Sequence, residues 1–431
     1  MNLTKDQEQA KQALLAFLLG SNKEFQLIGE GGTGKSYLIS WFNKEGYQSY
    51  VEACNMFSIK PMFNKIIVCA TTNKAAEVLA SQIHMEVNTI HHVLKLKVDF
   101  NYKTGVSKLK KYKPNYIIDN AVIFIDEASM IDKELYDYIN TTTYNCKIVY
   151  VGDNCQLKPV ANNFSVFSLP IPSAKLNQQV RFTGNQGIIN LAQQLRNTVL
   201  THNFTPLLAD GQQVVYLDNN DFKQKVCETF KELNPSARIV TYTNEKSKKY
   251  NDFIRHDVRN LTNKFTEGEH FISANVLEDG DNKKVLGIED EVEIYRVMRF
   301  VKANNDIPFD HYHMYIDTNN YGYLYLVRVP ADTAQYSAVL KDCAKRKDWY
   351  RWYYYTHKFA DLRPRDSCTI HKVQGTTIDD VFVDLTDIGK CTVPDTAARL
   401  LYVACTRARK HVYLCGKLPK KYGGSICLMK P

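Results

Sequence analysis

The octapeptide Gly29–Ser36 (GEGGTGKS) matches the phosphate-binding pattern G-x-x-x-x-G-K-[ST] at every fixed position. Lys35 is expected to reach the β- and γ-phosphates of a nucleoside triphosphate, and the Ser36 hydroxyl to bind Mg²⁺. An apolar strand over 25–28 and a helix over 36–42 flank the loop, which is the context that the motif requires. The backbone N–H groups that would surround the phosphates come from Gly29, Gly31, Gly32, Thr33 and Gly34. The sequence therefore predicts a loop that binds a nucleoside triphosphate.

Two adjacent carboxylates follow the fully apolar run 121–125. Asp126 is expected to hold Mg²⁺, and Glu127, pointing the other way, to act as general base on the attacking water. Helix capping by acidic residues is the alternative. Gln156 follows another buried run, 147–151, and is placed to sense the γ-phosphate or to orient water. Because each polar loop follows a parallel strand, these groups should share the carboxyl edge of one sheet.

Gln7 lies upstream of the loop in the stretch Leu3–Gln7. With Thr4 as N-cap, Gln7 occupies the N3 position of a capping box. The alternative is that its amide reads the adenine edge of the nucleotide.

Polar residues at other strand ends are candidates for contacts with nucleic acid. Thr72 and Asn73 follow the strand 65–70 and suit a phosphodiester backbone, although helix capping explains them equally well. In the second half, His371 and Lys372 are candidates for touching a base or phosphate, while a lone His is more often packed or capping. Gln374 and Gly375, just beyond, are expected to face the nucleotide.

In the stretch 89–115 apolar and polar residues alternate on either side of a Lys-Thr-Gly turn, and the stretch is strongly basic. This pattern predicts a hairpin inserted between strands of the main sheet. Phe100 and Tyr102 lie near its tip. A basic hairpin carrying aromatic side chains can stack on bases or wedge between them; a solvated hairpin is the alternative.

The second half repeats the strand–helix alternation without a second phosphate loop, which predicts a second doubly wound α/β domain. The expected strands of this domain are 214–217, 238–242, 381–385 and 411–415. The expected helices are 221–233, 244–259 and 395–405. An insertion interrupts it. Residues 268–329 read as a small β-barrel, and 335–362 as a basic, aromatic helical stretch. Those aromatics fit packing against a neighbouring domain, with nucleic-acid contact as the alternative.

The expected organisation therefore has four parts, all in an α/β fold. They are a first doubly wound domain (1–88 and 116–172), a hairpin insertion (89–115), a second doubly wound domain (173–264 and 366–431) and a barrel-plus-helix insertion (265–365).

The composition of the chain indicates which kind of partner and which cellular compartment to expect. The net charge of +9 over 431 residues favours an anionic partner and a basic groove. Eleven cysteines without a C-x-x-C pair, and no secretory signal, predict free thiols, no structural zinc and a cytoplasmic location. No apolar run approaches the ~18 residues that a membrane span needs, so no membrane partner is expected.

Taken in order, the motifs resemble the series of superfamily 1 helicases. The matching pieces are Gln7, GEGGTGKS, ATTNKAA, NTIHHVL, FIDEASM, GDNCQLKPV, the Arg181 segment, IVTYTN, TIHKVQGTT and LYVACTRARK. They run from residue 3 to 410. The chain is similar to the RecD-type branch in its TIHKVQG and LYVACTRAR segments and in its short hairpin. Its short insertions are similar to those of the Dda-like members of that branch in T-even phages.

The resemblance implies two RecA-like domains that close on ATP and move 5′→3′ along single-stranded DNA. The hairpin would split the duplex, and an SH3-like barrel would clamp the strand. Arg181 and Arg407 would act as arginine fingers, whereas residue type alone favours surface ion pairs. Binding or hydrolysis of ATP would involve Lys35, Ser36, Asp126, Glu127, Gln156, Arg181, Gln374 and Arg407. DNA would be faced by Thr72, Asn73, His91, Thr243, Asn244, Thr369, His371 and Lys372.

The resemblance thus predicts a monomeric, DNA-stimulated helicase of replication, recombination or repair. Its partners would be single-stranded DNA, junctions of single- and double-stranded DNA, and single-strand-binding or other replisome proteins. Two alternatives stay open: a phosphate-loop ATPase that remodels a protein, and an RNA helicase. Nothing in the sequence reads a 2′-OH, so the choice of DNA rests on the resemblance.

Overall fold

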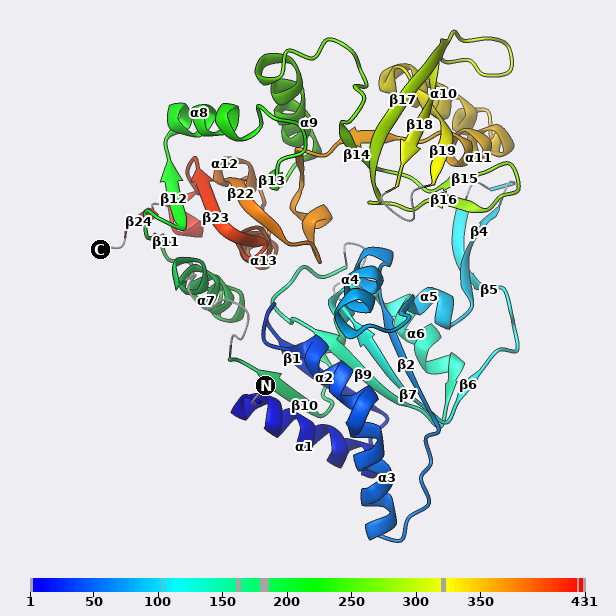
Figure 1. Cartoon of the computed structure of the whole chain (residues 1–431), viewed down its shortest axis with the longest axis vertical. Helices are drawn as coiled ribbons and strands as arrows, with labels where there is room; N and C mark the ends of the chain where they lie inside the picture. The colour runs from blue at the N-terminus through cyan, green and yellow to red at the C-terminus, as the bar shows by residue number, and fades with distance from the viewer. Residues whose placement is uncertain are drawn as a thin grey trace. The chain divides into compact units, whose positions relative to one another are not determined.

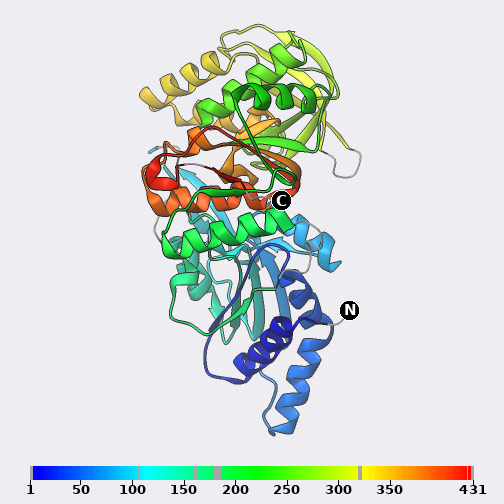
Figure 2. The same ribbon diagram turned by 90° about the vertical axis from the view of Figure 1, so that its left-hand side faces the viewer.

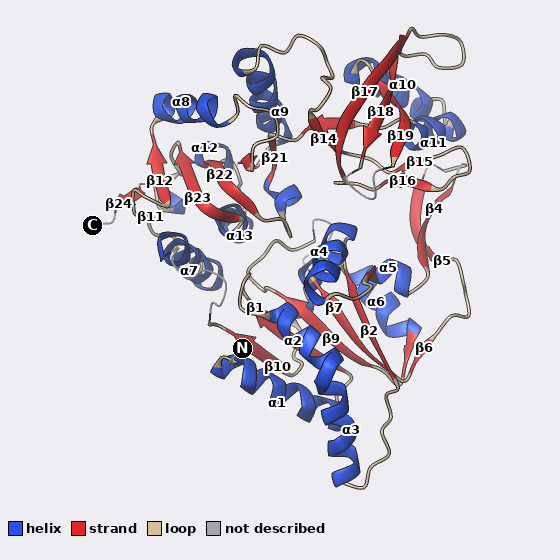
Figure 3. Cartoon of the chain, in the orientation of Figure 1, coloured by secondary structure: helices blue, strands red, loops and turns tan. Residues whose placement is uncertain are grey.

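The computed structural model describes residues 3–101, 103–104, 106–159, 164–178, 186–318, 323–424 and 426–428. The chain divides into two compact units. The first comprises residues 1–98 and 109–202, and the second residues 99–108 and 203–431. Each unit contains a parallel sheet covered by helices (Figures 1 and 3).

A six-stranded parallel sheet forms the centre of the first unit, in the order β10-β1-β9-β7-β2-β3. Its strands are β1 (Glu24–Gly29), β2 (Lys65–Ala70), β3 (Asn88–Thr89), β7 (Ala121–Asp126), β9 (Lys147–Gly152) and β10 (Ser173–Leu176). The central strands β7 and β9 are buried along almost their whole length and are largely apolar, because helices cover both faces of the sheet. All strands run the same way, so the phosphate loop, Asp126 and the loop after β9 emerge at one edge of the sheet.

Alternate strand residues build two separate cores, one on each face of this sheet. On one face Phe25, Val122 and Val149 pack with α1 to α4; Figure 2 shows the blue helices on this side of the strands. On the other face Ile123 and Ile148 pack with α5 and α6. The helices are α1 (Lys5–Leu19), α2 (Lys35–Trp41), α3 (Tyr47–Met56), α4 (Asn73–Ile83), α5 (Ile90–Val93), α6 (Lys133–Thr142) and α7 (Gln186–Thr201).

Smaller elements complete the first half of the chain. They are the hairpin of β4 (Leu96–Asn101) and β5 (Val106–Lys111) and the parallel pair β6 (Ile118–Asp119) and β8 (Thr143–Tyr144). The hairpin occupies the predicted stretch, but its tip, residues 99–108, groups with the second unit.

The expected domain boundary after residue 172 differs from the boundary of the compact unit. Strand β10 begins at Ser173 and pairs in parallel with β1 from Gln26 to Gly29, which satisfies backbone groups on that side of β1. The first unit then continues through α7 to His202. The change of unit therefore lies about thirty residues later than the sequence pattern indicated.

The second unit contains a five-stranded parallel sheet in the order β12-β23-β22-β13-β21. Helices α8 and α9 cover one face and α13 the other (Figure 1). The strands are β12 (Val214–Leu217), β13 (Ala237–Thr241), β21 (Ser367–Thr369), β22 (Ile378–Asp384) and β23 (Ala408–Cys415), with the short parallel pair β11 (Leu207–Ala209) and β24 (Ile426–Leu428). The helices are α8 (Asn219–Thr229), α9 (Asn244–Phe253), α12 (Leu385–Ile388) and α13 (Pro394–Thr406).

The insertion in the second unit is an antiparallel sheet in the order β19-β18-β17-β14-β20. Its strands are β14 (His270–Ser273), β17 (Glu291–Val301), β18 (His311–Asp317), β19 (Leu324–Pro330) and β20 (Leu362–Pro364), with the small hairpin β15 (Leu277–Glu278) and β16 (Lys284–Leu286). Among the described strands the sheet is open rather than a closed barrel, because β19 and β20 end it without pairing. The SH3-like barrel is therefore not confirmed.

Two helices, α10 (Thr333–Lys345) and α11 (Trp349–Lys358), follow this sheet. Their aromatic residues form a core: Tyr336 and Tyr355 pack with Phe309 and Phe359. Packing thus accounts for part of the aromatic stretch that the sequence pattern left open between a core and a nucleic-acid surface.

All eleven cysteines are free thiols. Among the helices of the described residues, none has the length and apolar character that crossing a bilayer requires.

Candidate functional site

The phosphate loop joins β1 to α2, with Gly34 as the N-cap of the helix in a left-handed conformation (φ 91°). A Cβ on Gly34 would lie 2.2 Å from the Gln7 amide nitrogen, so both backbone conformation and space require glycine there. Around Gly31, by contrast, a Cβ would meet no atom within 4 Å. The loop therefore has open space on one side and the side chain of Gln7 on the other.

Lys35 folds over this loop. Its ammonium group donates hydrogen bonds to the carbonyl oxygens of Gly29 and Glu30, both at 2.7 Å. The same charge acts on Asp126, whose pKa is raised by burial, with Lys35 pulling it back down. Lys35 and Asp126 thus face one small region of space, as binding of a phosphate and its counter-ion requires.

Gln7 fills the capping role that the spacing predicts, and reading of the adenine edge stays a prediction. Its side chain and that of Thr4 form the reciprocal capping box at the start of α1. Its amide nitrogen also donates to the Thr33 carbonyl at 3.2 Å. Because Gln7 is only 5 % exposed, this hydrogen bond is a buried contact between the start of α1 and the phosphate loop.

Asp126 and Glu127 stand at the end of β7, and Glu127 adopts a left-handed conformation (φ 50°) that turns the chain out of the strand. Thr71, at the end of β2, donates its N–H to the Asp126 carbonyl and its hydroxyl to the Glu127 carbonyl, at 3.3 and 3.1 Å. This fixes the backbone of both acids.

The residues present fit a divalent cation held together with a nucleotide. Ser36 offers a hydroxyl and Asp126 a carboxylate, which are the oxygen ligands that Mg²⁺ prefers. A cation there would compensate the burial that raises the Asp126 pKa. The part of the chain that the structure describes has no cluster of three His, Cys, Asp or Glu side chains for a metal. A cation with few protein ligands plus phosphates suits such a site.

Gln156 is buried, 3 % exposed, in the loop after β9, and its N–H donates to the Asp153 carbonyl at 3.2 Å. The Asp153 carboxylate is itself fully buried and pairs with Arg196 of α7 at 2.8 Å. Arg196 also pairs with Glu30 of the phosphate loop at 3.3 Å. Sequence reasoning missed this arginine because it belongs to none of the motifs, although it is the one charged residue of the helix α7.

In the second unit, three residues expected to face DNA line one cavity of about 690 Å³: Asn244, Thr369 and Lys372. The aromatic rings of Phe271 and Tyr336 also line it. So does Lys264, whose pKa burial lowers to about 8. The carboxylates of Glu245, Asp252 and Asp361 line it as well, so the cavity carries charges of both signs.

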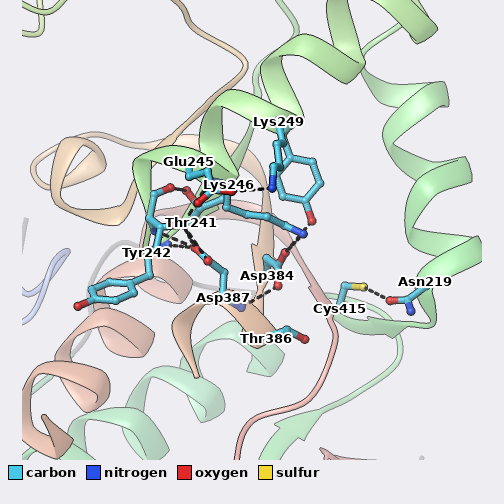
Figure 4. A network of polar contacts seen from close by, with 12 residues as sticks. Asn219, Thr241, Tyr242, Glu245, Lys246, Lys249, Asp384, Thr386, Asp387 and Cys415 are labelled. Atoms are coloured by element: carbon cyan, nitrogen blue, oxygen red, sulfur yellow. Dashed lines mark hydrogen bonds and ion pairs between the residues drawn. The ribbon is translucent and has the colours of Figure 1, made fainter. Parts of the chain in front are cut away.

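Thr243, the N-cap of α9, is held by an acid that sequence reasoning missed, Asp387, which Figure 4 shows beside Tyr242. The Asp387 carboxylate accepts the N–H groups of Tyr242 and Thr243 at 2.9 and 2.8 Å, and the Thr243 hydroxyl at 2.9 Å. Lys390 donates to it at 2.9 Å. Burial raises the pKa of Asp387, but the hydrogen bonds from Lys390 and Thr243 lower it further, so that it lies below its usual value. The TYTN loop therefore depends on a buried carboxylate 144 residues further along.

Arg407 ends α13 and is 8 % exposed. Its guanidinium donates to the Thr376 carbonyl at 3.5 Å, next to Gln374 and Gly375. The structure thus brings these three expected nucleotide residues close together within the second unit. His371, in the same segment, is partly buried, and burial lowers its pKa.

On the first unit, the expected DNA residues follow β2 and β3. Thr72 caps α4 by accepting the Ala75 N–H at 3.2 Å, and both Thr72 and Asn73 are exposed. His91 lies on α5, where burial lowers its pKa. Capping is therefore a role that Thr72 fills, and the exposure of both residues is compatible with a ligand.

At the hairpin tip, the Phe100 ring stacks on Trp352 of α11 with centroids 5.3 Å apart and planes at 7°. It also contacts Tyr353 at 5.4 Å. One face of the Phe100 ring is therefore occupied by protein rather than open to a base. Tyr102 and Arg181 lie outside the described residues.

Comparisons with known proteins agree with this arrangement. Residues 2–214 match the family model described as an AAA domain, and residues 367–415 that of the UvrD-like helicase C-terminal domain. The ATP-dependent DNA helicase dda of Enterobacteria phage T4 is 25 % identical over 452 residues, covering 96 % of this chain and 99 % of that protein. An uncharacterized protein of Acanthamoeba polyphaga mimivirus is 24 % identical over 499 residues, covering 95 % and 98 %.

Among solved structures, a Pif1 helicase from Bacteroides in complex with ADP-AlF3 and ssDNA shares the fold, with a TM-score of 0.51 at 13 % identity over 100 % of this chain and 95 % of that one. A Pif1 structure describing unwinding at forked dsDNA has a TM-score of 0.52 at 16 % identity, covering 96 % and 92 %. The ordered motifs, both family models and the end-to-end similarity to dda place this chain in helicase superfamily 1, as a relative of Dda.

Proposed function

We propose that this protein is an ATP-dependent DNA helicase that moves along single-stranded DNA and unwinds duplex DNA. One observation carries the proposal: the phosphate loop, Lys35, Asp126 and Glu127 meet at one sheet edge in a chain that matches the helicase dda from end to end. The relative dda is described as an ATP-dependent DNA helicase, and the two Pif1 neighbours as helicases. An RNA helicase or a remodeller of proteins is therefore not favoured.

In this proposal ATP is held by Lys35, the loop glycines and Thr33, with Gln7 bracing the loop. Ser36 and Asp126 would hold Mg²⁺, which when bound would neutralise phosphate charge. Glu127 accepts the proton of the attacking water, and Gln156 orients that water. Arg181 and Arg407 stabilise the charge that develops on the γ-phosphate, with Gln374 and Gly375 beside the nucleotide.

DNA is bound by hydroxyl, amide and basic groups at strand ends. Thr72, Asn73 and His91 contribute from the first unit. From the second come Thr243, Asn244, Thr369, His371 and Lys372. The cavity lined by Asn244, Thr369 and Lys372 supports this assignment, because it brings an amide, a hydroxyl and an ammonium group together. The hairpin over 89–115 is the proposed wedge, with Tyr102 and Phe100 near its tip.

The test is ATP-driven unwinding of duplex DNA carrying either a 5′ or a 3′ single-stranded tail. We expect unwinding from the 5′ tail and single-strand-stimulated hydrolysis, both lost in Lys35→Ala. Lys44→Ala, which removes an exposed lysine of the same unit, is the matched control. Preference for the 3′ tail would contradict the polarity. Hydrolysis that ignores DNA but responds to RNA or to a protein would contradict the substrate.

A further inference from the structure

Arg196 connects two loops that belong to the nucleotide site. Through separate nitrogens its guanidinium contacts Asp153 Oδ1 at 2.8 Å, Asn154 Oδ1 at 3.1 Å and Glu30 Oε1 at 3.3 Å. The Arg196 and Glu30 side chains are 16 % and 10 % exposed, and that of Asp153 is fully buried. Charge-assisted contacts in such a dry setting are stronger and more directional than surface ion pairs.

The Asp153 end of this bridge shapes the turn that carries Gln156. One carboxylate oxygen of Asp153 accepts both the Cys155 N–H at 3.0 Å and the Arg196 guanidinium. The Asp153 carbonyl accepts the Gln156 N–H at 3.2 Å. A buried carboxylate without its cation would be strongly unfavourable, so Arg196 is what allows Asp153 to hold this turn.

The Glu30 end reaches the phosphate loop itself. The Glu30 carbonyl accepts the Lys35 ammonium at 2.7 Å and the Thr33 hydroxyl at 2.9 Å. Fixing the Glu30 side chain therefore also fixes the backbone that Lys35 and Thr33 use. Arg196 thus binds at once to the loop that would hold the phosphates and to the loop that would orient water.

Arg196 lies on α7, where the side chains of Ile188, Leu191 and Leu195 are buried. Helix α7 is also the last helix before the chain passes into the second unit at Asn203. A planar guanidinium with fixed donor directions suits three acceptors on two loops, which a single ammonium point does not.

We propose that Arg196 is a positioning residue for ATP hydrolysis, holding the phosphate loop and the Gln156 turn in register through Glu30 and Asp153. This inference rests on the proposed function, since it assigns Arg196 a part in the same reaction. It concerns the step of hydrolysis rather than nucleotide binding, because Arg196 contacts the two loops through side chains and leaves the loop N–H groups for phosphate.

The test compares Arg196→Gln, Arg196→Lys and Glu30→Gln by steady-state ATP hydrolysis with single-stranded DNA and by titration with a fluorescent ADP. For Arg196→Gln we expect kcat to fall on the order of tenfold to a hundredfold, as small misplacements of catalytic groups cause, with ADP affinity nearly unchanged. Arg196→Lys should recover only part of kcat. Arg346→Gln, which removes an exposed arginine paired with Asp342, should behave as wild type.

The double variant Glu30→Gln/Arg196→Gln distinguishes positioning from general stabilisation. If Arg196 acts through Glu30, the double variant should lose no more kcat than Arg196→Gln alone, because the two changes remove one connection. Should Arg196→Gln fail to fold, Glu30→Gln alone carries the test, since it leaves the pair with Asp153 in place. It should then lower kcat without weakening ADP binding.

Normal kcat in folded Arg196→Gln, or multiplying effects in the double variant, would overturn the inference. A loss of ADP binding in proportion to kcat would do so as well. The proposed function fails in a different way: the wild type would then show no DNA-stimulated hydrolysis, or Lys35→Ala would keep it.

Discussion

Gln7 donates a hydrogen bond from Nε2 to the backbone carbonyl of Thr33 at 3.2 Å, joining the first helix to the phosphate loop across 26 residues of sequence. The contact is buried, and the same amide group lies where any Cβ on Gly34 would fall. We expect Gln7→Ala to weaken nucleotide binding by about three- to tenfold, the worth of one hydrogen bond. Titration with a fluorescent ADP measures it, with Gln12→Ala on the exposed side of α1 as control. Unchanged affinity would show that the capping box is the only role of Gln7.

Replacing Glu127 should separate binding from turnover. Glu127→Gln keeps the shape of the side chain but cannot accept a proton at neutral pH, so ATP should bind normally while kcat falls by at least ~10²-fold. Nucleotide titration measures ATP binding, and single-turnover hydrolysis measures the rate of turnover. Glu134→Gln, an exposed glutamate of α6, is the control. Normal turnover in Glu127→Gln would remove it as the general base.

Asp387 predicts a specific dependence of stability on pH. Its folded pKa is below the unfolded value of about 3.9, so its contribution is present above that pH and is lost as the pH falls through the folded pKa. Asp387→Asn should therefore be less stable than wild type at neutral pH, and the difference should shrink below about pH 4. Urea denaturation across this range measures it, with Asp281→Asn, exposed in a turn, as control. A difference that does not vary with pH would contradict the ionised role.

The same variant should also weaken DNA binding, if Thr243 contacts DNA as proposed. Without the carboxylate, the N–H groups of Tyr242 and Thr243 lose a charged acceptor, and the TYTN loop loosens. Fluorescence anisotropy with a labelled single strand should show lower affinity in Asp387→Asn at a temperature where the variant is folded. Equal affinity in folded Asp387→Asn would contradict the assignment of Thr243.

The stack of Phe100 on Trp352 predicts that the hairpin tip needs α11 for support. An aromatic pair of this geometry contributes roughly 0.5–1.5 kcal/mol. Phe100→Ala and Trp352→Ala should each slow duplex unwinding while leaving single-strand-stimulated ATP hydrolysis unchanged, and the double variant should be no worse than either. Tyr350→Ala, which removes a largely exposed ring of the same helix, is the control. If Phe100→Ala alone slows unwinding, the ring acts on DNA rather than through Trp352.

The sequence by itself determined the local elements and the order of the motifs. The strand β12 begins and ends at the predicted residues, and the Thr4–Gln7 capping box forms as its spacing predicts. The phosphate loop follows a strand and begins a helix, as the motif requires. These features depend on residues within a few positions of one another, so short stretches of sequence are enough to specify them.

Only the tertiary structure decided which distant groups meet. Arg196 and Asp387 belong to no motif, yet they contact loops that lie 43 and 144 residues away in the sequence. The change of unit lies beyond α7 rather than before β10, since β10 pairs with β1. Among the strands that the structure describes, the inserted sheet is open, and Phe100 packs on Trp352. Pairing of strand edges and packing of rings are non-local choices, which alternation and composition along the chain do not specify.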